Sequence, residues 1–154
     1  MPANSTRAFR HLNAPRPRVY RALIDAQAVA QWRVPEGMSS EVHVFDAHEG
    51  GVFRISLSYD HPIGTGKTND RTDTYHGRFV KLVANRTVAE TMEFETEDPT
   101  MRGEMRVTYT LADAGGGTDL FAVHDQLPPG VSPADNETGW RMALDKLAAL
   151  VERD

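Results

Sequence analysis

The 154-residue chain contains no cysteine. This absence excludes disulfide bonds, thiolate metal sites and cysteine nucleophiles, and it agrees with a reducing compartment. Aromatic residues are also few, at 8% of the chain, but hydrophobic residues reach 40% and the composition is that of a globular protein. Since a chain of this length forms about one domain with a sizeable core, we assign residues 1–154 to a single domain.

Basic residues are outnumbered by acidic ones. The 17 lysines and arginines face 22 aspartates and glutamates, which gives a formal net charge of -5. Nucleic-acid binding is disfavoured because it depends on clustered cations that release counterions from phosphates. No run approaches the roughly 20 apolar residues that span a bilayer, and residues 1–10 lack the apolar core of a signal peptide. We therefore expect a cytoplasmic protein without a membrane span.

The N-terminal part of the chain predicts one strand followed by two short helices. Residues 6–12 suit a strand that ends before Pro15, and Pro15 and Pro17 stand where a helix can begin. A second short helix is expected from Asp25 to Trp32, and the segment Val34-Pro35-Glu36-Gly37 ends it.

Beyond Glu41 the apolar residues recur at every second position, which is typical of strands with one buried face. Strands are expected around Val42 and Val44, and then over Phe53–Tyr59, Thr74–Val83, Thr87–Glu95, Met101–Leu111 and Thr118–Gln126. The short connections between the later strands favour an antiparallel meander. The polar segment Asp60–Asp73 is expected to be an exposed loop. Its Gly-Lys-Thr at 66–68 lacks the spacing and the strand-to-helix context of a phosphate-binding loop.

The C-terminal segment predicts a long amphipathic helix. Trp140, Leu144, Leu147 and Val151 recur at the spacing that places side chains on one helical face, and Ser132 or Asp135 could cap its N-terminus. That apolar face needs a partner, and the strands before it supply a sheet. The sequence therefore predicts an α+β fold, in which a curved antiparallel sheet of six or seven strands wraps around this helix.

Several short motifs in this order resemble the START and birch-pollen-allergen-like superfamily, whose architecture is the helix-grip fold. They are similar above all to the branch that contains the C-terminal domain of the activator of the 90-kDa heat-shock protein's ATPase. The matching segments are Ala14-Pro15, Val19-Tyr20-Arg21-Ala22-Leu23, Trp32 with Pro35-Glu36-Gly37, Gly50-Gly51-Val52-Phe53-Arg54, Gly77-Arg78-Phe79, Gly115-Gly116-Gly117-Thr118, His124, and Gly139-Trp140 with Leu144 and Leu147.

The resemblance implies a hydrophobic cavity between sheet and helix more firmly than it implies any activity. One departure from the family pattern concerns the end of the second helix, where Arg33 and Val34 replace a tryptophan and a glycine. A polar or charged group is therefore expected near the mouth of the cavity.

His124 is the first candidate for a chemical role. Strand alternation places it with Leu120 and Ala122 on the face toward the long helix, where a neutral imidazole could bind a ligand or transfer a proton. The alternative is a buried histidine that is satisfied by the backbone or by Tyr109.

Glu90 is the second candidate, because it is in phase with the apolar residues of its strand. A carboxylate there would have a raised pKa unless an arginine reached it. It could orient a ligand, but a slip in strand register or a local ion pair is an alternative explanation. His124 with Glu90 or Tyr109 would be the catalytic pair of an enzyme similar to the superfamily's cyclases and hydrolases.

Flexible methionines and aromatic rings suit an adaptable apolar binding surface. The candidate ligand-binding residues are Trp32, Phe53, Tyr59, Met92, Phe94, Met101, Met105, Tyr109, His124, Trp140 and Leu144. The alternative is that these side chains form a solid core. No metal site and no cofactor are expected, since His43, Asp46 and His48 do not all share one strand face.

Three functions remain in competition at this point. The leading hypothesis is a domain that binds an apolar or amphipathic small molecule. The others are an enzyme that uses His124, and an interaction module associated with a chaperone, which the family resemblance alone suggests. The sequence does not distinguish a monomer from a homodimer.

Overall fold

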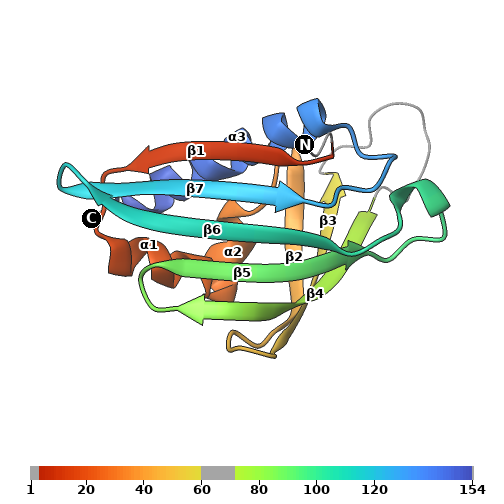
Figure 1. Ribbon diagram of the computed structural model, residues 1–154, viewed down its shortest axis with the longest axis horizontal. Helices are drawn as coiled ribbons and strands as arrows, with labels where there is room; N and C mark the ends of the chain where they lie inside the picture. Colours follow the sequence, from red (N-terminus) through yellow and green to blue (C-terminus); the bar gives the residue numbers. More distant parts are fainter. Residues whose placement is uncertain (1–3, 60–71, 154) are drawn as a thin grey trace.

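The computed structural model of the protein describes residues 4–59 and 72–153. Its elements run in the order β1, α1, α2, β2 to β5, a short 3-10 helix η1, β6, β7 and α3 (Figure 1). Their bounds are β1 Thr6–Leu12, α1 Arg16–Leu23, α2 Ala26–Trp32, β2 Met38–Phe45, β3 Val52–Tyr59, β4 Thr72–Val83, β5 Thr87–Phe94, η1 Pro99–Met101, β6 Met105–Ala114, β7 Gly117–Asp125 and α3 Pro133–Val151.

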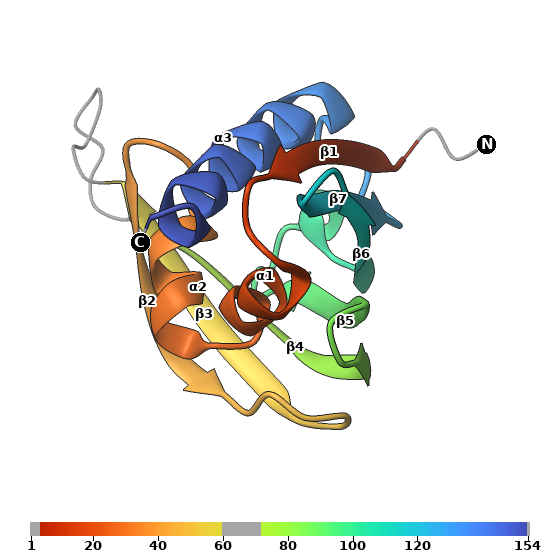
Figure 2. The same ribbon diagram turned by 90° about the vertical axis from the view of Figure 1, so that its left-hand side faces the viewer.

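The seven strands form one antiparallel sheet in the order β1-β7-β6-β5-β4-β3-β2. The sheet curls so strongly that β1 and β2 lie on either side of α3, while α1 and α2 occupy the hollow beside it (Figure 2). Register shifts in β2 and β4 contribute to the bend, because a bulged strand turns more sharply than a regular one.

Gly77 in the middle of β4 is required by this curl. A Cβ at this position would lie 1.9 Å from the carbonyl oxygen of Thr91 and 2.9 Å from Cζ of Phe53. The glycine therefore allows the neighbouring backbone and the Phe53 ring to approach closely on the concave side of the sheet.

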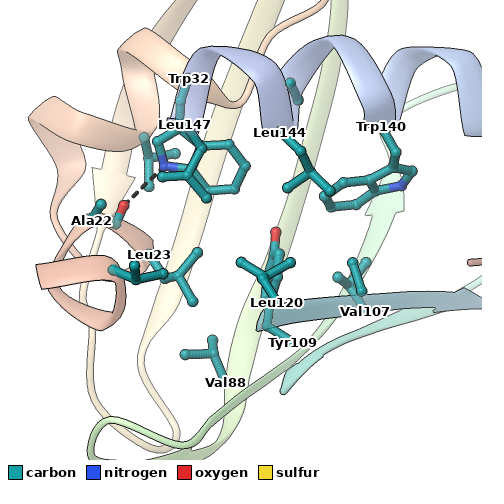
Figure 3. Close-up of a cluster of buried hydrophobic side chains, with 14 of the residues drawn as sticks. Ala22, Leu23, Trp32, Val88, Val107, Tyr109, Leu120, Trp140, Leu144 and Leu147 are labelled. Atoms are coloured by element: carbon teal, nitrogen blue, oxygen red, sulfur yellow. Dashed lines mark hydrogen bonds between the residues drawn. The ribbon is translucent and has the colours of Figure 1, made fainter. Parts of the chain in front are cut away.

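α3 covers the concave face of the sheet. It begins at Pro133, and the hydroxyl of Ser132 accepts a hydrogen bond from the backbone N–H of Asp135, so Ser132 is the N-cap. Leu144 points from α3 toward Tyr109 and Leu120 on the sheet, and Leu147 lies beside Trp32 (Figure 3). This interface forms the main core, in which the predicted stripe is buried.

α1 and α2 close one end of the core. Trp32, the last residue of α2, is 1% exposed, and its indole N–H donates a 2.9 Å hydrogen bond to the carbonyl oxygen of Ala22 in α1 (Figure 3). The buried indole is thus satisfied without water, and the two short helices are held together.

The predicted fold class is confirmed, with seven strands, two short helices after the first strand and one long C-terminal helix. One prediction was wrong, because Met101 does not lie in a strand. The Asp98 side chain accepts a hydrogen bond from the N–H of Thr100 and caps the 3-10 turn that contains Met101, so β6 begins only at Met105. The predicted loop 60–73 overlaps the start of β4 at Thr72, and its residues 60–71, including the Gly-Lys-Thr segment, lie outside the described residues.

Leu147→Ala should lower the free energy of unfolding by about 2 to 5 kcal/mol, because it removes a wholly buried side chain and leaves a cavity. Leu150→Ala, one turn further along α3, is the matched control, since Leu150 is only partly buried. Urea denaturation of both variants measures the difference. Equal losses would contradict the placement of α3.

Candidate functional site

A cavity of about 320 Å³ lies between the sheet and the N-terminal half of α3. Its walls come from the segment after α2, from the concave face of the sheet and from α3, so residues far apart in the sequence meet in it. The lining residues are Arg33, Val34, Pro35, Met38, Leu57, Tyr59, Asp73, Tyr75, Met92, Phe94, Met105, His124, Asp135, Asn136, Gly139, Trp140 and Ala143. The volume is at the lower end of the range of small-molecule sites, and most of the lining side chains are apolar or aromatic.

A buried ion pair joins Arg33, which lines this cavity, to Glu90, which does not. Nη1 of Arg33 is 2.9 Å from Oε1 of Glu90 and donates a 3.1 Å hydrogen bond to Oε2, and the two side chains are 7% and 0% exposed. The guanidinium also lies 5.8 Å from the centre of the Phe53 ring and 5.6 Å from that of Tyr75. Burial raises the pKa of Glu90, and the charge and hydrogen bond of Arg33 oppose that rise. Since an arginine keeps its proton in a protein, we treat the pair as ionised and neutral in sum.

His124 is held in one tautomer by two hydrogen bonds from α3. The indole N–H of Trp140 donates to Nδ1 over 3.1 Å, and the Asn136 amide nitrogen lies 3.0 Å from the same atom. Because an indole nitrogen can only donate, Nδ1 is the acceptor and the proton of the neutral ring is on Nε2. Nε2 lies 3.2 Å from the sulfur of Met105. Burial, assisted by the charge of Arg33, lowers the pKa of His124 to about 4, so the ring is neutral at pH 7.

Two carboxylates stand at the mouth of the cavity. Asp73 at the start of β4 and Asp135 in the first turn of α3 both line it and are both exposed. Of the described lining residues, Arg33 is the only lysine or arginine, and Glu90 neutralises it. The described lining residues therefore offer no unpaired positive charge.

The predicted ligand-binding residues fall into three groups. Six of them line the cavity, namely Tyr59, Met92, Phe94, Met105, His124 and Trp140. Trp32, Phe53, Tyr109 and Leu144 are buried in the core and are absent from the cavity wall. Met101 lies beside a separate small hollow near Thr72 and Thr96, because η1 carries it away from the concave face.

The three candidate catalytic residues do not form one site. Glu90 pairs across the sheet with Val107, and Val107 pairs with His124, so the carboxylate and the imidazole stand two strands apart, about 10 Å between backbones. Val107 fills the position between them. The buried hydroxyl of Tyr109 has no hydrogen-bond partner among the described residues, and it is not the partner of His124. Burial keeps its pKa well above the ordinary value.

Several residues that shape the site were not predicted from the sequence as ligand-binding residues. Arg33 was noticed as a departure from the family pattern, but its pairing with Glu90 was not foreseen. Asn136 precedes the apolar stripe on α3, and Gly139 was noted only as part of a family motif, so helical periodicity gave no reason to expect either residue in the cavity wall. Leu57 and Tyr75 could have been found, because both alternate in phase with inward-facing residues of their strands.

A second hollow, of about 340 Å³, lies at β3, β4 and β5 on the convex side of the sheet. Four of its charged or titratable side chains, Arg54, His76, Glu93 and Glu95, are paired with one another. Nε and Nη2 of Arg54 donate hydrogen bonds of 2.9 and 3.0 Å to Glu95, and Nδ1 of His76 lies 3.0 Å from Glu95. These contacts lower the pKa of Glu95 to about 2, with the hydrogen bond from Arg54 as the largest cause. We therefore take the concave cavity as the candidate site.

The fold is that of a helix-grip domain, in which a curled sheet closes on a long helix. Residues 13–152 match the family described as "Activator of Hsp90 ATPase homolog 1-like protein". The chain belongs to this family. Within the described residues, no helix has both the length and the apolar character needed to cross a bilayer.

Solved structures agree with this assignment. A protein from Chromobacterium violaceum is 34% identical, with a TM-score of 0.88, and the match covers 98% of this chain and 99% of that one. A protein from Rhodobacter sphaeroides is 23% identical with a TM-score of 0.77, over 96% and 92% of the two chains, and shows the fold. One from Arthrobacter aurescens, 16% identical with a TM-score of 0.80 over 97% and 86%, shows the same. A search of curated proteins found no match.

Acidification should destabilise the protein through His124. Between pH 6.5 and the folded-state pKa of about 4, the unfolded chain binds a proton that the folded chain excludes, so the free energy of unfolding falls as the pH is lowered. The contribution is about 2 kcal/mol between pH 7 and pH 5. Urea denaturation across this range tests it, with His124→Gln as the variant that lacks this dependence. Parallel pH curves for the two proteins would contradict the assignment.

Glu90→Leu should cost about 3 to 5 kcal/mol of unfolding free energy, because it leaves the Arg33 charge buried and unpaired. Arg33→Met combined with Glu90→Leu should recover most of that loss, since no buried charge remains. Glu93→Leu, on the opposite face of the same strand, is the control for the substitution itself. The pairing would be refuted if the double variant lost as much unfolding free energy as the Arg33→Met and Glu90→Leu variants lose together.

Proposed function

We propose that this protein binds a small apolar or amphipathic molecule in the cavity between the sheet and α3. The observation that carries the proposal is the incomplete filling of the concave face. Leu144 and Leu147 fill the space beneath the C-terminal half of α3, whereas Gly139 and Ala143 leave room beneath its N-terminal half. A folded chain that needed only stability would close this space with side chains, since an unfilled cavity lowers stability.

Catalysis by His124 is the weaker alternative. The nitrogen that could accept a proton, Nδ1, already accepts a hydrogen bond from Trp140, and the low pKa makes the ring a poor base at pH 7. Glu90 is held by Arg33 and is absent from the cavity wall. The arrangement suits recognition of a ligand better than proton transfer.

An action on a chaperone is suggested by the family's description alone. It would be tested by the ATPase turnover of a 90-kDa heat-shock protein in the presence of saturating amounts of this chain. Because the cavity provides no argument for such an action, small-molecule binding remains the proposal.

Gly139→Phe should abolish ligand binding while keeping the fold. A Cβ at Gly139 meets no atom within 4 Å, and this residue lines the cavity, so the ring would occupy the ligand's space. Binding of 2-ethylnaphthalene, a neutral apolar probe, is expected to be saturable in the parent protein. In the variant the affinity should fall at least about tenfold, which corresponds to a loss of roughly 1.4 kcal/mol of binding free energy.

The matched control is Ala149→Phe, at an exposed position of the same helix. It should bind the probe as the parent protein does. The absence of saturable binding to the parent protein would refute the proposed function, and equal binding by the two variants would place the binding site elsewhere.

A further inference from the structure

We propose that the cavity selects a neutral ligand with a hydrogen-bond acceptor oxygen, such as a ketone, ester or ether, which His124 recognises through its Nε2–H group. This inference rests on the proposed function and specifies the class of ligand. It follows from three features of the cavity: a donor with a poor partner, a fixed tautomer, and the sign of the surrounding charges.

The donor is the Nε2–H group of His124. Its one hydrogen-bond contact within the described part of the chain is the Met105 sulfur, at 3.2 Å. A thioether is a weak acceptor, so its contact with the buried N–H compensates only part of the free energy that desolvation of this donor costs. A ligand oxygen that displaced the flexible Met105 side chain would form the stronger bond. Both residues line the cavity, so the ligand can reach this position.

The donor cannot change into an acceptor, because α3 fixes the tautomer. Trp140 donates to Nδ1 over 3.1 Å, and its own ring lines the cavity beside the imidazole, with the ring centres 6.0 Å apart. A switch to the other tautomer would place two N–H groups opposite each other in a buried site. His124 therefore presents a proton to the ligand and favours an acceptor over a second donor.

The charges disfavour an anionic ligand. Arg33, the only cation among the described lining residues, is already neutralised by Glu90, and the exposed carboxylate of Asp135 also lines the cavity. An ionised acid would lose its hydration and find no unpaired positive charge among the described lining residues in return. The site thus separates neutral acceptors from carboxylates, although both carry oxygen atoms.

Three probes with the same aromatic body test this selectivity at neutral pH by isothermal titration. They are 2-ethylnaphthalene, which has no polar atom, 2-acetylnaphthalene, which adds a ketone oxygen, and 2-naphthoate, which carries the charge. We expect the ketone to bind about three- to tenfold more tightly than the hydrocarbon, as one buried hydrogen bond provides. The carboxylate should bind more weakly than the ketone.

His124→Phe should remove the preference for the ketone and leave hydrocarbon binding within about twofold, whereas Met105→Leu should keep the preference. If His124→Phe fails to fold, the 15N chemical shift of Nε2 in the parent protein provides the readout, because it should change with the ketone and stay unchanged with the hydrocarbon.

The outcomes separate the two proposals. Equal affinity for ketone and hydrocarbon, or tightest binding of the carboxylate, would overturn the inferred selectivity and leave a binding cavity in place. The absence of binding by all three probes would refute the proposed function itself.

Discussion

The concave face of a strongly curled sheet has to be covered, and in this protein one helix provides most of the cover. A straight helix and a curved sheet cannot match along their whole length. Where they approach closely, the buried side chains of Leu144 and Leu147 fill the space between them. Toward the N-terminus of α3 the surfaces diverge, and small residues such as Gly139 and Ala143 leave a cavity there. The core and the candidate site are therefore two parts of the same interface.

The polar groups of the site also depend on how the elements pack against one another. Two contacts join polar groups from different elements: Arg33 at the end of α2 meets Glu90 of β5, and Trp140 of α3 meets His124 of β7. A buried ion pair usually contributes little net stability, because desolvation of the charges offsets their attraction. We infer that the pair matters chiefly because it neutralises the Arg33 charge at the cavity wall, which leaves neutral donors such as the His124 N–H group to direct binding.

Much of the fold could be predicted from periodicity, because each element buries one face and the period of burial is local information. The alternation in β5 and β7 placed Glu90 and His124 correctly on the concave face, and the stripe from Trp140 to Val151 placed α3. Met101 shows where the method fails. Its position agreed with the alternation of β6. However, Met101 lies in the 3-10 turn that Asp98 caps, and the positive φ of Gly103 separates this turn from the start of β6. Such a break depends on turn geometry, which alternation does not reveal.

The site was harder to predict than the fold because its contacts join residues distant in sequence. Arg33 and Glu90 are 57 positions apart, and no local pattern links them. The hydrogen bond that fixes the tautomer of His124 could not be predicted either. Helical spacing placed Trp140 in the core, but the direction of its indole N–H depends on how α3 is rotated against β7. That rotation decides the chemistry of the imidazole. The same tryptophan that packs the helix onto the sheet makes Nδ1 an acceptor and leaves the proton of His124 on Nε2, so the packing of the fold and the proposed selectivity of the site share one residue.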